Sequence, residues 1–149
     1  SVPIAGMALT VQDGAIGSRQ MSPTFFQGFP SGEINVPEGT GDADNLVAIE
    51  LTVDFPIDAT YLIHTTMVTR GGADTRILGR VKDENGNWVG QGIQNSHSVG
   101  GMVGSQTGSS TAVHHFSAGS HTLRLIVWGG GGNVRGSSVI TAIPFAQTP

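Results

Sequence analysis

Alternating apolar and polar residues are clearest in residues 46–55, which read LVAIELTVDF. The apolar set is Val47, Ile49, Leu51, Val53 and Phe55, and the residues between them are Ala48, Glu50, Thr52 and Asp54. A period of two predicts a β-strand with one packed face and one wet face. Pro56 follows. Because proline has no N–H to donate to a neighbouring strand, it predicts the end of this element.

Further strands are predicted downstream, separated by turn signals. Residues 60–69, TYLIHTTMVT, are rich in β-branched residues, and their two faces differ little, which indicates partial burial on both sides. Residues 76–95 predict a hairpin around Asn85-Gly86, a dipeptide that favours the positive φ angles of a type I′ turn. Strands are also predicted over residues 7–11, 111–116, 121–128 and 138–145. The Gly- and Ser-rich residues 96–110 predict a long loop, and no segment predicts a helix.

The predicted strand at residues 121–128 is apolar on both sides. One side carries Leu123, Leu125 and Val127. Ile126 and Trp128 occupy the other side, where water would be expected. A strand of this kind is buried on both faces. Two explanations stay open: the second face lies in the seam of an oligomer, or the N-terminal segment covers it. The residues predicted for the oligomer interface are Ile126, Trp128 and Trp88.

Residues 1–45 differ from the rest of the chain because they show little periodicity and contain several prolines. Three aromatic residues, Phe25, Phe26 and Phe29, lie close together in this segment. Aromatic side chains exposed on an irregular segment would be costly in a monomer. We therefore expect the segment either to fold back as edge strands or to dock on a partner.

Composition narrows the classes of function. The chain has 149 residues with 23 glycines, 12% charged residues and a net charge of −4, which fits one all-β domain with many tight turns. No basic block is present to follow a nucleic acid or an anionic membrane surface. No apolar run reaches the roughly 18 residues that span a bilayer. With no cysteine, disulfides and thiolate metal sites are excluded.

The five histidines raise the question of a metal site. They are His64, His97, His114, His115 and His121. His114 and His115 are neighbours on a predicted strand, so they point to opposite faces and cannot chelate one ion together. His121 follows the turn at Gly119, where a local hydrogen bond is expected. We therefore predict surface or hydrogen-bonded histidines and no metal site.

Other candidate chemistry is also better explained by structure. The acids lie in predicted turns or on wet strand faces, and no serine sits in a strand–turn–helix elbow. The run Gly129–Gly132 lacks the Lys-Ser/Thr of a phosphate-binding loop and predicts a mobile loop. Trp88 and Trp128 are expected in core or subunit packing rather than in sugar stacking. We expect no enzyme activity and no cofactor.

The C-terminal third carries a family resemblance. Residues 118–123, AGSHTL, precede one predicted strand, and residues 138–143, SVITAI, form the last. This arrangement resembles the trimeric jelly roll of the tumour necrosis factor and complement globular-head class, especially its phage and bacterial members. The resemblance implies an all-β, antiparallel jelly-roll β-sandwich that forms a homotrimer. Residues 1–45 would then be an N-terminal arm of the same domain, and residues 46–149 the jelly-roll core.

Within that class we expect a viral structural protein. The expected role is a trimeric decoration or cement protein that binds the major capsid protein on the exterior of a phage virion. Its arm would contact the capsid through Phe25, Phe26 and Phe29. The alternative is the receptor- or glycan-binding tip of a phage tail fibre or spike, with a host-surface glycan bound through Trp88 or residues 96–110.

Overall fold

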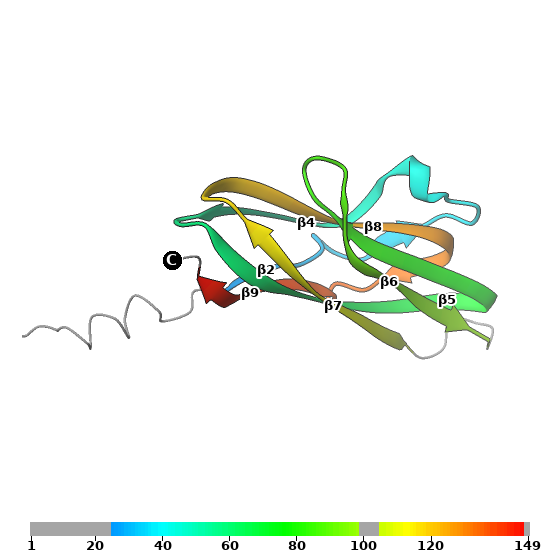
Figure 1. The fold of residues 1–149 in the computed structure, drawn as a ribbon. Coiled ribbons are helices and arrows are strands. Elements are labelled where there is room, and N and C mark those ends of the chain that lie inside the picture. The colour runs from blue at the N-terminus through cyan, green and yellow to red at the C-terminus, as the bar shows by residue number, and fades with distance from the viewer. Residues whose placement is uncertain (1–24, 99–104, 148–149) are drawn as a thin grey trace, which may run out of the picture.

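The computed structural model describes residues 25–98 and 105–147, and these form an antiparallel β-sandwich (Figure 1). The elements in chain order are β2 (Phe26–Gly28), β3 (Ile34–Val36), the short 3₁₀ helix η1 (Asp42–Asp44), β4 (Leu46–Phe55), β5 (Ala59–Lys82), β6 (Trp88–His97), β7 (Gln106–Phe116), β8 (Gly119–Val134) and β9 (Val139–Gln147). The strand predicted at residues 7–11 lies outside the described residues.

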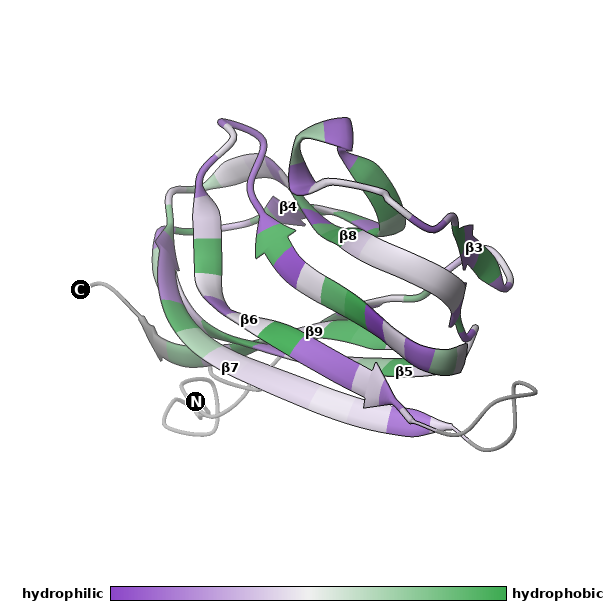
Figure 2. Ribbon diagram, turned by 90° about the vertical axis from the view of Figure 1, so that its right-hand side faces the viewer, coloured by the Kyte–Doolittle hydropathy of each residue, from purple (hydrophilic) through white to green (hydrophobic). Residues whose placement is uncertain are grey.

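One continuous sheet curls into two layers, because β5 and β8 are long enough to belong to both. The first half of β5 pairs with β7 and β9, and β9 pairs with β2 at the edge. The second half of β5 pairs with β6 and β8, and β8 pairs with β4. β3 pairs with the C-terminal end of β8. The β2–β9–β5–β7 layer and the β4–β8–β5–β6 layer face each other across the core (Figures 1 and 2).

The alternation in residues 46–55 produces β4 with the predicted bounds. Ile49, Leu51, Val53 and Phe55 are buried as expected. A shift in register between Val47 and Ile49 changes the start of the strand: Ala48 is buried, whereas Val47 is only half-buried. The prediction that Val47 packs in the core and Ala48 faces water was wrong, because a bulge reverses the alternation of faces.

The predicted mobile loop at Gly129–Gly132 is wrong, because these residues continue β8. Gly129, Gly130 and Gly131 have φ angles of 88°, 117° and 89°, and Gly132 pairs with Val36 and Gly71. A Cβ atom at Gly130 would collide with the backbone of Pro37. The glycines therefore let β8 turn from one layer into the other beneath a closely packed neighbouring chain segment.

The long loop predicted for residues 96–110 is shorter than expected. His97 ends β6, and residues 106–110 already belong to β7, where they pair with β5. Serine, threonine and glycine are weak strand formers on their own. Pairing with the 24-residue β5 supplies the hydrogen bonds that the local sequence does not predict.

The Asn85-Gly86 hairpin exists, but its turn is not type I′. Gly86 alone has positive φ, at 83°, and its N–H donates to the carbonyl of Asp83. The Asp83 side chain accepts bonds from the N–H groups of Asn85 and Asn87, both at 2.9 Å. This carboxylate stabilises a three-residue loop with glycine at the bulge position.

Aromatic rings fill one end of the core. Phe55 stacks on Phe116 with ring centroids 4.6 Å apart, and it meets Tyr61 at 4.5 Å. Phe26 packs edge-on against Phe55 at 5.6 Å. Strand β2 is thus attached to the layer by its hydrogen bonds with β9 and by one inward aromatic ring. In the described part of residues 1–45, β2 and β3 are edge strands of the sandwich.

Candidate functional site

The histidines do not gather into a catalytic or metal-binding cluster. No group of three potential metal ligands occurs within residues 25–98 and 105–147. His114 is half-buried against Phe116, whereas His115 is exposed beside Thr60, as expected for neighbours on one strand. In the part of the chain that the structure describes, no helix is long and apolar enough to cross a membrane.

His121 joins the β5–β6 hairpin to the start of β8. Its Nδ1 lies 2.8 Å from Glu84 Oε2, and its Nε2 lies 2.9 Å from the carbonyl oxygen of Ser117. Burial alone would raise the pKa of Glu84, but the N–H of Thr122 and the His121 ring bond the carboxylate, and the net pKa is lowered. The pair holds two chain segments together, the hairpin between β5 and β6 and the start of β8.

A buried polar cluster lies at the end of the core opposite the aromatic rings. His97 Nε2 is 2.9 Å from Thr69 Oγ1, and Asn95 Nδ2 donates to the carbonyl of Met67 and to Thr69 Oγ1, both at 3.0 Å. Burial lowers the pKa of His97. These bonds satisfy groups that β6 directs inward, so the cluster has a structural explanation.

Two outward faces of the sandwich remain, and they differ in chemistry. The first, called here the uncharged face, is the outward side of β2, β9, residues 60–68 of β5, and β7. Its described side chains are Gln27, Thr60, Leu62, His64, Thr66, Val68, Thr107, Ser109, Thr111, Val113, His115, Val139, Thr141, Ile143 and Phe145. None of these is Asp, Glu, Lys or Arg. His64 bonds Thr111 Oγ1 at 2.9 Å, and Gln27 donates to Thr141 Oγ1 at 3.3 Å.

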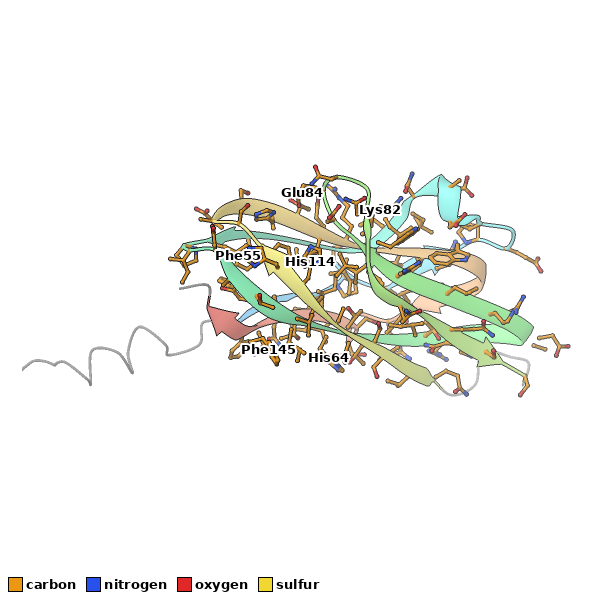
Figure 3. The ribbon with its side chains drawn as sticks, in the orientation of Figure 1. Phe55, His64, Lys82, Glu84, His114 and Phe145 are labelled. Carbon is orange, nitrogen blue, oxygen red and sulfur yellow. The ribbon has the colours of Figure 1, made fainter. Side chains whose placement is uncertain are left out.

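Exposed apolar side chains concentrate on the uncharged face. Phe145 is 64% exposed and Val113 is 55% exposed. Leu62, on the central strand, pairs with both Val113 and Ile143. Phe145 and His64 lie on the lower side of the sandwich in Figure 3, whereas Phe55 lies between the layers. In Figure 2 β7 is pale along most of its length, neither strongly hydrophobic nor strongly hydrophilic.

The three phenylalanines predicted for the N-terminal arm do not act alike. Phe26 is half-buried and packs against the core, edge-on to Phe55. Phe25 and Phe29 are 56% and 53% exposed. Because Phe26 points inward, the alternation of β2 places Phe25 and Phe29 on the same side as Gln27, at the border of the uncharged face.

The second face is the outward side of β4, β8, β6 and the second half of β5, called here the tryptophan face. The indole rings of Trp88 and Trp128 are 6.0 Å apart. Arg80 and Lys82 approach the Trp88 ring, at 5.2 Å and 4.6 Å from its centroid. Lys82 Nζ also donates to Asn45 Oδ1 at 3.0 Å. Cation–π contacts of this kind stabilise the rings and hold the two cations in place.

Trp88 and Trp128, two of the three residues predicted for the oligomer interface, are therefore close together. The third, Ile126, lies on β8 with Trp128. Ile126 does point away from Leu125 and Val127, as predicted, but it is 2% exposed within the single chain. Its neighbours across the sheet are Val47 and Arg80. Burial of Ile126 thus needs no partner protein. An interface at Trp88 and Trp128 stays a prediction, to which Ile126 adds little surface.

The uncharged face cannot be recognised as a candidate site from the sequence. One signal was present: the two faces of residues 60–69 differ little, which predicted partial burial on both sides. In the structure inward Tyr61, Ile63 and Met67 alternate with outward Leu62 and His64. Only the pairing of β5 with β7 and β9 shows that uncharged residues from three further strands adjoin this outward side.

Comparison with known proteins identifies the fold. No protein-family model matches the sequence, and no curated protein sequence matches it. Among solved structures, the Eiger TNF of S. frugiperda is 13% identical with a TM-score of 0.60, over 85% of this chain and 95% of that chain. Murine APRIL is 11% identical with a TM-score of 0.56, over 83% and 99%. The globular domain of zebrafish complement 1qA is 10% identical with a TM-score of 0.50, over 83% and 98%. The chain therefore has the jelly-roll fold of the TNF and complement globular-head class.

Proposed function

We propose that the protein is a non-enzymatic structural protein that assembles as a homotrimer through its uncharged face. The observation that supports this proposal most directly is the chemistry of that face: the described residues of β2, β7, β9 and the first part of β5 (residues 60–68) present apolar and uncharged polar side chains to the outside, without one Asp, Glu, Lys or Arg. Surfaces of monomers carry charges interspersed with apolar groups, and extended apolar surface marks an interaction site.

The energetics favour a symmetric assembly. Full burial of one large apolar side chain contributes about 1.5–3 kcal/mol, and Phe145 and Val113 are more than half exposed in the single chain. In a closed cyclic trimer every protomer makes the same contacts, so Phe145 and Val113 are buried three times, once in each protomer. The trimer is also what the family resemblance of residues 118–123 and 138–143 implies.

A charge placed on this face tests the proposal. Val113→Asp puts a carboxylate into the interface of the trimer, where burial of a charge is costly, yet the side chain is exposed enough for the single chain to fold. We expect light scattering to give three times the 15.4 kDa chain mass for the native protein and the single mass for the variant. Ser96→Asp, on the tryptophan face, is the matched control and should stay trimeric. A native monomer, or a trimeric Val113→Asp variant, would overturn the proposal.

We further propose that this trimer decorates the exterior of a phage capsid and ties neighbouring copies of the major capsid protein together. Phe25 and Phe29 support this role, because they flank the edge strand β2 and are exposed at the border of the uncharged face. Mass spectrometry of purified virus particles tests it through copy number. Hundreds of copies per particle are expected, a few copies would indicate a tail protein instead, and none would exclude a virion role.

A further inference from the structure

The tryptophan face concentrates positive charge on a protein whose net charge is −4. Four of its seven Lys and Arg residues lie on this face: Arg76, Arg80, Lys82 and Arg124. Only Arg124 has a carboxylate partner there, at 2.7 Å from Glu50. The other ion pairs of the described residues join His121 to Glu84 and Arg135 to Glu33. Three cations on the outward side of one strand, Arg76, Arg80 and Lys82, therefore form no ion pair within the described residues.

The two indole rings meet across this row of cations. Trp88 on β6 is paired with Lys82, and Trp128 on β8 is paired with Leu78, so the strand that carries the cations runs between them. Their ring centroids are nevertheless 6.0 Å apart. The rings therefore lean over β5 toward each other, with Arg80 beside them at 5.2 Å from Trp88. Both tryptophans stay half-exposed.

Packing within the chain accounts for only part of this arrangement. The ring of Trp128 and the stem of Arg80 help to cover Ile126, which explains why apolar surface is needed there. Arg80 Nε donates to the carbonyl of Gly90 at 2.6 Å and Lys82 Nζ donates to Asn45 Oδ1 at 3.0 Å, which holds these two side chains in place. These neutral acceptors do not cancel the charges of Arg76, Arg80 and Lys82, and like charges at neighbouring positions of one strand repel each other. A bound anion would relieve that repulsion.

We propose that the tryptophan face binds an acidic saccharide, such as a chain of uronic acid residues. The indole rings supply flat apolar surfaces for the C–H faces of sugar rings, and Arg80, Lys82 and Arg76 supply donors for carboxylates. A saccharide with one charge per ring matches a face that alternates aromatic and cationic groups. The proposal does not depend on the trimer, because the two faces belong to opposite layers.

Tryptophan fluorescence is a direct measurement of this site, because the chain has two tryptophans and both lie on this face. The probe is an oligogalacturonate, compared with a neutral malto-oligosaccharide and an oligothymidylate of equal length, at about 50 mM NaCl. We expect the oligogalacturonate alone to change the fluorescence in a saturable way. The affinity should fall at least about tenfold as NaCl rises to about 500 mM.

Variants assign the binding to named residues. The double change Arg80→Gln and Lys82→Gln should weaken binding at least about tenfold, since two charge-assisted contacts are lost. Trp128→Phe, which keeps an aromatic ring over Ile126, should weaken it less, and Trp128→Ala more. Arg135→Gln, on a cation already paired with Glu33, is the matched control and should bind as the native protein does.

Each alternative outcome contradicts the proposal in its own way. Equal binding of the neutral sugar would show that charge plays no part. Tighter binding of the oligothymidylate would replace the saccharide with a nucleic acid. No fluorescence change with any of the three probes, or native affinity in the Arg80→Gln and Lys82→Gln variant, would exclude the site. The trimer test is separate, because Val113→Asp should bind the oligogalacturonate with unchanged affinity per chain.

Discussion

The side chain of His97 shows how a single residue can link stability to pH. It is buried at the end of the core, where its Nε2 shares a hydrogen bond with Thr69. Burial lowers the pKa of His97 in the folded protein below the ordinary value of 6.5. The unfolded chain therefore binds a proton at a higher pH than the folded chain does.

The sign of the effect follows from this difference in proton binding. As pH falls below about 6.5, His97 binds a proton in the unfolded state but stays neutral in the folded state. The free energy of unfolding therefore decreases until the pH falls below the pKa of His97 in the folded protein. We predict that the native protein loses stability between about pH 7.5 and about pH 5, and that His97→Gln loses less. Urea denaturation at both pH values measures this difference.

The contribution of Glu84 lies in a different pH range. Its pKa is lowered in the folded protein, so the stability it adds is present above the unfolded value of 4.5 and is lost as pH falls through the folded pKa. Measurements above about pH 5 thus lie above the range in which Glu84 loses its contribution. If His97→Gln shows the same loss of stability as the native protein, the histidine is not the group responsible.

At the level of elements, β8 depends on glycines that the sequence alone assigns to a loop. Gly130 has φ of 117°, and a Cβ atom there would collide with the Pro37 backbone. We predict that Gly130→Ala lowers the free energy of unfolding by at least about 2 kcal/mol, because both the backbone and its neighbour must shift. Thermal or urea denaturation gives the value.

The control for this prediction is another glycine in the same part of the chain. Gly136 is exposed, its φ is not in the left-handed region, and the atoms nearest to an added Cβ are 3.9 Å away. Gly136→Ala should change stability by less than about 1 kcal/mol. Equal effects at both positions would show that the close approach of β8 to Pro37 is not what makes Gly130 necessary.

At the level of the whole molecule, the two outward faces should differ in their response to salt: assembly through the uncharged face should change little, whereas saccharide binding to the tryptophan face should weaken. The uncharged face carries no Asp, Glu, Lys or Arg among its described residues, so screening has little to act on. We predict that the dissociation constant of the trimer changes less than about threefold between about 50 mM and about 500 mM NaCl. Sedimentation velocity over a dilution series measures it. A trimer that dissociates in salt would place charged contacts in the seam.

Particular elements show how far the sequence could be interpreted. Strand β4 was predicted with its exact bounds, because its alternation is strict and Pro56 ends it. The start of β7 was not predicted, because residues 106–110 are polar and show no strand pattern of their own. They form a strand through pairing with β5, which lies beside them. The phenylalanines near the N-terminus were identified, but which of them enters the core depends on the register of β2 against β9.

The sequence by itself determined the class of fold, since a period of two with turn residues between strands admits only an antiparallel β-sandwich or barrel. It also predicted that the neighbouring His114 and His115 point to opposite faces of their strand, which the structure confirms. The tertiary structure alone decided the two outward faces, because each is assembled from strands distant in the sequence. His64 meets Thr111 and Thr141, and Trp88 meets Trp128, only through long-range pairing. Local periodicity predicts that a side chain points outward, but it does not predict which side chains from other strands lie next to it.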